Sequence, residues 1–176
     1  MKSFEGQVAL VTGAGGGIGL ATASAFAQAG ASVIVADNDA ALLETAADGL
    51  RSAGHQVLAI TCDVTDRGQV NAMIEQSVRT YGRLDAAFNN AGINSDGAPM
   101  IETEDDEFDN IVNVNLRGVW NCMKAELRQM VAAQGSGATS LTYQVQPRYS
   151  LDWAVGPAPA AAALAVLRQH CPPPRK

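Results

Sequence analysis

A glycine-rich run directly after a short apolar run constrains the fold of this chain more than any other feature. Residues 8–11 (VALV) are all apolar, and residues 12–19 (TGAGGGIG) lead into an alanine-rich stretch with a helical pattern. A strand that turns through glycines into a helix leaves unpaired N–H groups, and these groups and the helix dipole attract an anion. Glycines are needed because the turn is tight and a phosphate must approach the backbone closely. The run therefore predicts an anion-binding turn, and a turn with a purely structural role is the alternative.

Short apolar runs and helical patterns alternate along the first 133 residues. Alternating strands and helices joined by short loops predict an α/β fold, a Rossmann-like doubly wound parallel sheet with helices on both faces. Right-handed crossovers then favour the strand order 3-2-1-4, truncated after the fourth strand, with residues 138–145 as a candidate for a degenerate fifth strand. The expected strands are 7–12, 32–36, 56–62 and 84–88, and the expected helices are 17–29, 39–53, 66–81 and 104–133.

Polar residues follow three of these strands, at the sheet edge where such folds bind ligands. They are Asp37, Asp63 and residues 89–90. Asp37 comes 18 residues after Gly19, where a carboxylate can accept both hydroxyls of an adenosine ribose. Its charge would repel a 2′-phosphate, which favours NAD over NADP. The alternative is a solvated loop aspartate beside Asp39, which we expect to cap the next helix.

Four motifs, in this order and on these elements, resemble the short-chain dehydrogenase/reductase family over about residues 5–135. They are residues 12–19 (TGxxxGIG), 62–64 (CDV), 89–92 (NNAG) and 112–115 (VNVN). The resemblance implies an NAD-dependent enzyme that moves hydride between nicotinamide and a small-molecule alcohol or ketone. The cofactor-binding residues that it implies are Gly13, Gly17, Ile18, Gly19, Asp37, Asp63, Val64, Asn90 and Gly92.

The resemblance also assigns roles to these positions. The glycines of the turn would line the pyrophosphate, and Ile18 would offer a backbone N–H group. Asp63 and Val64 would bracket the adenine, and Asn90 with Gly92 would lie along the nicotinamide ribose. Thr12 and Asn89 would brace the strands. Asn115 would be the one catalytic residue present, anchoring a water of the proton relay. The alternative for Asn115 is a surface amide.

The rest of the family's catalytic set is missing from this chain. The family uses a serine, and a tyrosine followed four residues later by a lysine, which lowers the tyrosine pKa from its ordinary value near ~10. The chain has lysines only at positions 2, 124 and 176, so it contains no Tyr-x-x-x-Lys. We therefore expect impaired catalysis. A non-catalytic NAD-binding module is an alternative, as are an inactive frameshifted product and a chain completed by an intact relative in a mixed oligomer.

Charge and composition change sharply near the end of the last expected helix. One acid, Asp152, and six of the seven prolines lie after residue 131, where the chain becomes rich in alanine and proline. We expect a dinucleotide-binding domain over residues 1–135 and a poorly ordered or irregular tail over 136–176. The change motivates the hypothesis that the tail arises from out-of-frame translation near codon 138.

Composition also excludes several classes of function. The net charge of −6 argues against a nucleic-acid partner. No apolar run is long enough to span a membrane, and no signal peptide is expected at the N-terminus. The three cysteines are far apart and in no metal-ligand spacing, which favours a cytoplasmic protein without a metal site. The broad apolar stripe of the 104–133 helix suggests a homo-oligomer formed through that helix.

Overall fold

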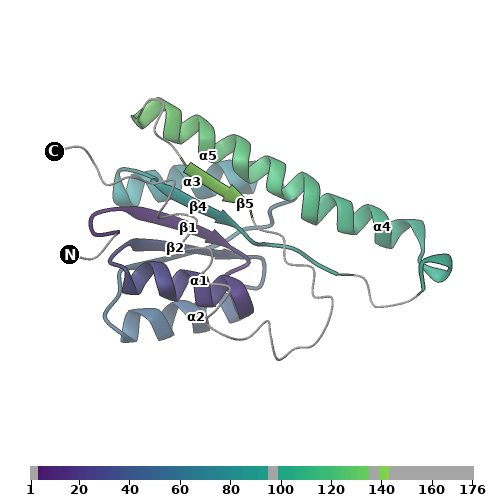
Figure 1. The fold of residues 1–176 in the computed structure, drawn as a ribbon, viewed down its shortest axis with the longest axis horizontal. Coiled ribbons are helices and arrows are strands. Elements are labelled where there is room, and N and C mark those ends of the chain that lie inside the picture. Colours follow the sequence, from purple (N-terminus) through teal and green to yellow (C-terminus); the bar gives the residue numbers. More distant parts are fainter. Residues whose placement is uncertain (1–3, 95–98, 135–138, 143–176) are drawn as a thin grey trace.

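The computed structural model describes residues 4–94, 99–134 and 139–142, which form a parallel sheet with helices on both faces (Figure 1). The strand order is β3-β2-β1-β4-β5, and every neighbouring pair is parallel. The predicted fold and the order 3-2-1-4 are thus confirmed, and a fifth strand extends the sheet beside β4. The strands are β1 (Val8–Thr12), β2 (Ser32–Asp37), β3 (Val57–Thr61), β4 (Ala86–Asn89) and β5 (Thr139–Thr142).

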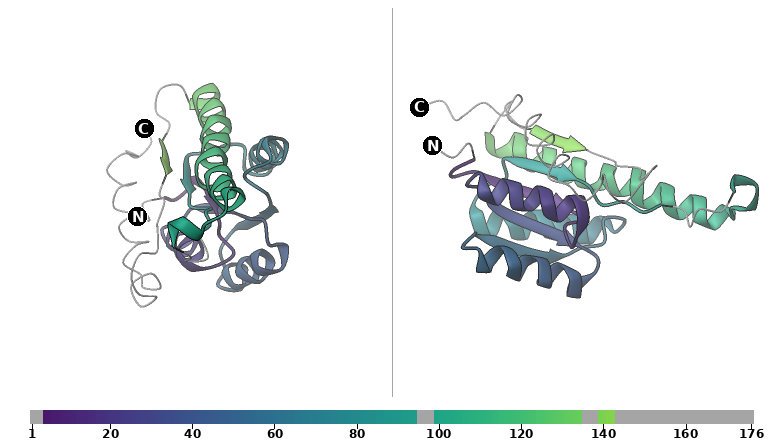
Figure 2. Two further views of the ribbon diagram at one scale, coloured as in Figure 1. Left: turned by 90° about the vertical axis from the view of Figure 1, so that its right-hand side faces the viewer. Right: turned by 60° about the horizontal axis from the view of Figure 1, so that its bottom comes forward.

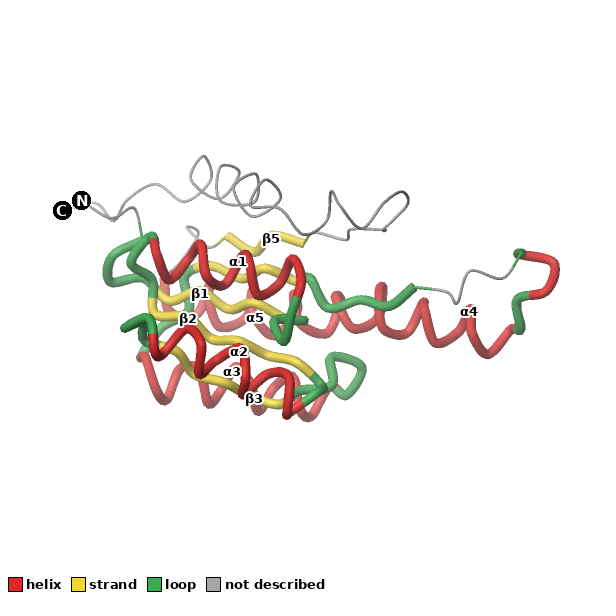
Figure 3. Tube along the Cα trace, turned by 90° about the horizontal axis from the view of Figure 1, so that it is seen from below, coloured by secondary structure: helices red, strands yellow, loops and turns green. Residues whose placement is uncertain are grey.

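Two layers of helices cover the sheet (Figure 3). α1 (Gly17–Gln28) and α2 (Ala40–Ser52) lie on one face, and α3 (Arg67–Tyr81) and α5 (Val119–Gln134) lie on the other. The fully buried strand β1 shows how the core divides, because side chains alternate between the faces of a strand. Ala9 and Val11 pack with α1 and α2, while Val8 and Leu10 pack with α3 and α5.

Aspartate side chains start two of the helices, as the sequence predicts. Asp39 accepts hydrogen bonds from the N–H groups of residues 41 and 42, each at 3.0 Å, and thereby caps α2. Asp66 accepts from Gln69 at 3.1 Å and Gly68 at 2.7 Å and caps α3. The hydrogen bonds from Gln69 and then Gly68 hold the pKa of the Asp66 carboxyl below its ordinary value.

The prediction of one regular helix over 104–133 was wrong in its interior. The helical rod consists of α4 (Asp105–Val112), a π-helical segment (Asn113–Gly118) and α5, and a 3₁₀ turn, η1 (Met100–Glu102), precedes it. Figure 2 shows α4 projecting past the ends of the strands. A π segment widens the helix locally and is frequent at functional sites. Apolar spacing alone does not reveal it, because the pattern on both sides of the segment is helical.

Apart from β5, the predicted tail over residues 136–176 lies outside the described residues. Among the described residues, every helix is too short or too polar to cross a membrane. The same residues contain no group of three or more His, Cys, Asp or Glu side chains arranged to hold a metal ion. Cys62 and Cys122 are buried free thiols.

Candidate functional site

The glycine-rich turn between β1 and α1 forms the floor of the site. Gly13 has a φ of +64°, which L side chains rarely adopt, so the chain reverses here at low cost only with glycine. The N-terminus of α1 packs so closely against this turn that a Cβ on Gly19 would collide with the Gly13 carbonyl oxygen. Gly17 and Ile18 occupy the first turn of α1, whose N-cap, Gly16, makes no side-chain capping bond. The first-turn N–H groups are therefore suited to bind an anion.

Polar side chains fix this turn to the end of β4. The Thr12 hydroxyl accepts hydrogen bonds from the N–H groups of Asn90 at 3.1 Å and Ala91 at 3.2 Å. The Asn90 amide donates to the carbonyl oxygens of Thr12 at 3.2 Å and Gly13 at 3.1 Å. Asn89 instead donates to Glu126 Oε2 on α5 at 2.9 Å. Thr12 thus braces β1 against the end of β4, as predicted, whereas Asn89 binds helix α5. Asn90 also holds the turn.

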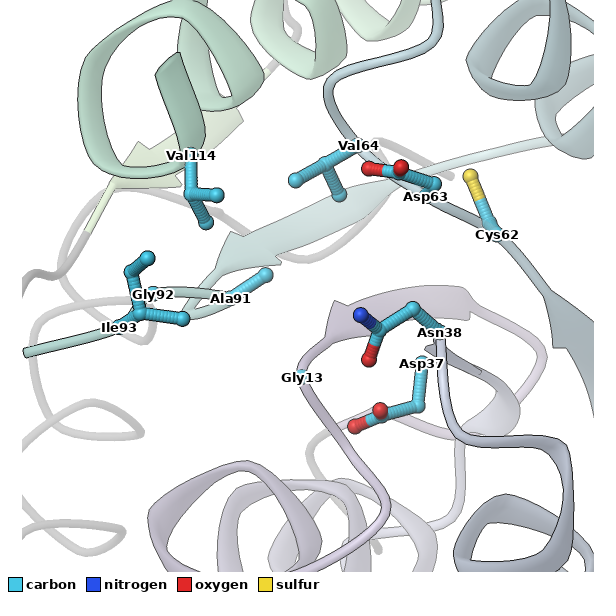
Figure 4. Close-up of a pocket in the computed structure, with 10 residues that line it drawn as sticks. All are labelled: Gly13, Asp37, Asn38, Cys62, Asp63, Val64, Ala91, Gly92, Ile93 and Val114. Carbon is cyan, nitrogen blue, oxygen red and sulfur yellow. The ribbon is translucent and has the colours of Figure 1, made fainter. Parts of the chain in front are cut away.

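A cavity of about 130 Å³ opens above the turn, at the carboxyl ends of the strands (Figure 4). Segments from β1, β2, β3, β4 and the π segment meet there. Of the residues expected to bind cofactor, the cavity wall includes Gly13, Asp37, Asp63, Val64 and Gly92. Gly17, Ile18, Gly19 and Asn90 belong to the turn and its support. Five lining residues were not predicted from the sequence, and these are Asn38, Cys62, Ala91, Ile93 and Val114.

Asp37 is held in place at the end of β2 by backbone donors. Its Oδ2 accepts from the Gly15 N–H at 2.9 Å, and its Oδ1 accepts from the Asp39 N–H at 3.1 Å. The carboxylate therefore links the second strand to the glycine-rich turn and remains half-buried at the cavity wall. The surface-aspartate alternative does not account for this contact with a turn 22 residues earlier in the chain.

The β3–α3 loop forms the opposite side of the cavity. Asp63 Oδ1 accepts from the Thr65 N–H at 2.9 Å and the Thr65 hydroxyl at 2.8 Å, which fixes the loop from within. Burial, together with the charges of Asp63 and Asp66, raises the pKa of the Cys62 thiol to about 11. Cys62 is therefore a neutral thiol at neutral pH, and it contributes packing and no nucleophile.

Asn115, the residue expected to be catalytic, lies in the π segment and binds backbone. Its Nδ2 donates to the Ile93 carbonyl oxygen and its Oδ1 accepts from the Ile93 N–H, each at 2.8 Å. This two-way bond anchors the chain after β4, where residues 91–93 line the cavity. Asn115 is half-buried, so the surface-amide alternative is wrong. Its neighbour Asn113 is exposed.

The missed residues had weak signals in the sequence. Asn38 and Cys62 lie beside Asp37 and Asp63, and the position after a strand end could have marked them. Ile93 and Val114 are apolar, and nothing in their chemistry separates a cavity wall from ordinary packing. Figure 4 shows Val114 and Val64 on neighbouring segments at the same end of the cavity.

The sequence and the fold of this chain resemble those of known proteins. The pattern of the short chain dehydrogenase family matches residues 7–139. The chain belongs to this family. A short chain dehydrogenase/reductase of Aspergillus oryzae, astE, is 44% identical over 137 residues, which are 77% of this chain and 52% of that protein. Secoisolariciresinol dehydrogenase of Forsythia intermedia is 37% identical over 140 residues, or 79% of this chain and 50% of that protein.

Solved structures of short-chain dehydrogenases share the fold. One from Mycobacterium smegmatis is 32% identical, with a TM-score of 0.78, over 96% of this chain and 71% of that one. Another, from Burkholderia phymatum and in complex with NAD, is 27% identical, with a TM-score of 0.74, over 96% of this chain and 60% of that one. The chain thus spans about half the length of the two relatives named above. NAD or NADP is the typical cofactor of the family.

Proposed function

We propose that this short-chain dehydrogenase chain binds NAD at the carboxyl ends of its strands, with a preference over NADP. The observation that carries the proposal is Asp37, a carboxylate hydrogen-bonded to Gly15 of the anion-binding turn. The diphosphate would lie on the N–H groups of Gly17, Ile18 and Gly19, and Asp37 would accept the hydroxyls of the adenosine ribose. Bound NAD supplies the hydride-accepting nicotinamide, and the protein binds and orients it.

The other cofactor contacts follow the two walls of the cavity. Asp63 and Val64 would bracket the adenine, and Asn90 with Gly92 would border the nicotinamide ribose. Asn115 would act at the nicotinamide end by holding Ile93 and by anchoring a water of the proton relay. NAD is supported as the ligand because a glycine turn, a carboxylate at the end of β2 and apolar side chains occur together around the cavity.

The expected reaction of the family is hydride transfer between nicotinamide and a small alcohol or ketone. This 176-residue chain has no Tyr-x-x-x-Lys, and the loss of one acid/base group costs on the order of 10²–10⁴ in rate. We therefore propose that the chain is an impaired oxidoreductase. The same absence favours a second function, a non-catalytic NAD-binding module.

Titration with NADH, followed by turnover assays on a panel of alcohols and ketones, tests both functions. Binding with slow turnover supports the impaired enzyme, and binding without turnover supports the module. A chain that is folded by circular dichroism but binds neither NAD nor NADH at millimolar concentration refutes both. Such a result would favour the inactive frameshifted product. Sequencing of the coding DNA around codon 138 tests the frameshift hypothesis independently.

We further propose that residues 1–135 form the binding domain of a cytoplasmic protein and that the chain assembles through its long helix. The rod exposes an apolar stripe, with 68% of Leu116, 58% of Trp120 and 57% of Val131 accessible. Exposed apolar patches of this kind mark association surfaces. Sedimentation should show a concentration-dependent oligomer that Trp120→Glu weakens, and a monomer at all concentrations would contradict the assembly.

A further inference from the structure

Asn121, on α5, is a buried side chain that binds the cavity wall from behind. It is 6% exposed, and its amide donates to the carbonyl oxygens of Val64 at 3.0 Å and Thr65 at 3.3 Å. These acceptors lie 57 and 56 residues earlier in the chain, in the loop between β3 and α3. A buried amide is costly unless its hydrogen bonds are satisfied, so a donor at this place needs these acceptors.

Gly118, one turn earlier on the same rod, brings the helix close to this loop. A Cβ at Gly118 would lie 2.6 Å from Cγ2 of Val64 and 3.2 Å from its Cβ. Residues three apart on a helix lie on the same face, so Gly118 and Asn121 contact the loop together. Gly118 allows the loop to approach the helix closely, and the Asn121 amide holds the loop against the helix through its hydrogen bonds.

The contacts that Gly118 and Asn121 make with the loop position one wall of the cavity. Val64 lines the cavity, and Asp63 and Thr65 on either side of it are hydrogen-bonded to each other. Asn115, on the adjoining π segment, holds Ile93 on the other wall. The two walls are thus fixed to one helical rod.

We propose that Asn121, together with Gly118, is a positioning residue for the adenosine half of the nucleotide. This inference rests on the proposed NAD site. The amide keeps the 63–65 loop at the spacing that admits an adenine ring between Val64 and the end of β2. When the donor is lost, the loop is free to relax, and the affinity for ligands that carry adenosine falls while the affinity for the nicotinamide half is retained.

The test is a titration of the full 176-residue chain with ADP-ribose and, separately, with nicotinamide mononucleotide. Asn121→Leu keeps the number and branching of the side-chain heavy atoms and removes the donor. We expect it to weaken ADP-ribose binding about 10-fold, the loss of about one hydrogen bond, with nicotinamide mononucleotide affected less than twofold. Gly118→Ala adds a methyl group that collides with Val64, so it should also change the ratio of the dissociation constants for ADP-ribose and nicotinamide mononucleotide. Asn115→Leu should show the reverse selectivity.

Controls separate positioning from stability. Asp85→Ala removes another buried hydrogen bond, from the Val8 N–H to the Asp85 carboxylate, at the amino ends of β1 and β4 and so at the far end of these strands from the cavity. It should lower the melting temperature and leave the ratio of the two dissociation constants unchanged. If Asn121→Leu does not fold, Asn121→Ser, which keeps a shorter donor, replaces it, with a smaller shift of the same ratio expected.

The possible results are distinct. A folded Asn121 variant that binds ADP-ribose as wild type does overturns the positioning role and leaves the NAD site intact. Equal losses for both ligands also overturn it, because a general loosening would then explain the effect. A wild-type chain that is folded yet binds neither NADH nor ADP-ribose refutes the proposed function and this inference together.

Discussion

Replacing Asp37 with asparagine should reverse much of the discrimination between the two nicotinamide cofactors. The amide is close in shape to the carboxylate. It can still accept a hydrogen bond from the Gly15 N–H, which lies 2.9 Å from Asp37 Oδ2 in the native chain, so the glycine-rich turn keeps its position. What disappears is one negative charge at the place where the ribose hydroxyls would bind. NADH should lose a few-fold in affinity, because hydroxyls bind a charged acceptor more strongly than a neutral one.

The magnitude follows from the charges. A 2′-phosphate carries about −1.5 to −2 charges and would lie about 4–5 Å from a carboxylate that otherwise binds the hydroxyl. At the half-exposed rim, an effective dielectric constant of about 60 gives about 2 kcal/mol of repulsion at the middle of these ranges. This corresponds to about a 30-fold change in the NADPH-to-NADH ratio of dissociation constants.

Fluorescence titration with NADH and NADPH at about 0.15 M salt measures that ratio. The control is Asp39→Asn, which removes a charge two residues away and keeps the α2 cap, because the amide oxygen can accept the same bonds. We expect the control to change the ratio less than threefold. If Asp37→Asn leaves the ratio within twofold of wild type, or if both variants change it equally, Asp37 does not discriminate between a 2′-hydroxyl and a 2′-phosphate on the adenosine ribose.

Three further outcomes concern stability and reactivity. Asp85→Ala removes the acceptor of the buried Val8 N–H, a bond of 2.8 Å, and should cost about 1–3 kcal/mol of unfolding free energy in a urea titration; an unchanged midpoint would contradict this. The cap bonds lower the pKa of Asp66, so its charge stabilises the fold above the ordinary pKa of 3.8 and this contribution is lost as pH falls through the folded-state pKa. The stability difference between wild type and Asp66→Asn should therefore be constant above about pH 5 and shrink in more acid solution. Because the pKa of Cys62 is about 11, alkylation at pH 7.5, followed by peptide mass spectrometry, should be slow in the native chain and fast in urea; equal rates would show that the thiol is accessible.

The sequence was most informative where side-chain chemistry acts locally. Asp39 and Asp66 cap their helices because a carboxylate two or three residues from free N–H groups has one favourable geometry. The strand order followed from alternation and handedness. Residues that follow a strand were predicted at the correct edge of the sheet. Asp37, Asp63 and Gly92 line the cavity because they lie at this edge.

The remaining features depend on contacts between distant parts of the chain. The π segment is not visible in a periodic apolar pattern, and neither is the bond that Asn115 in this segment makes to Ile93, which lies 22 residues earlier. From the sequence alone, Asn121 looks like an ordinary helix residue. Its role becomes visible only in the folded structure, where the β3–α3 loop packs against it. Val114 lines the cavity because the helix crosses there. No local rule would have found these residues.

The location of these supporting contacts separates binding from turnover. The turn is held by Asn90, one wall by Asn115 and the other by Asn121, and all three bonds lie within residues 12–121. These three contacts fix the turn and both walls of the cavity through residues that the chain contains. The tyrosine and lysine that the family uses for proton transfer do not contribute to any of these contacts. Nucleotide affinity should therefore survive in this chain even where turnover does not, because the residues that shape the cavity are distinct from those that would move the proton.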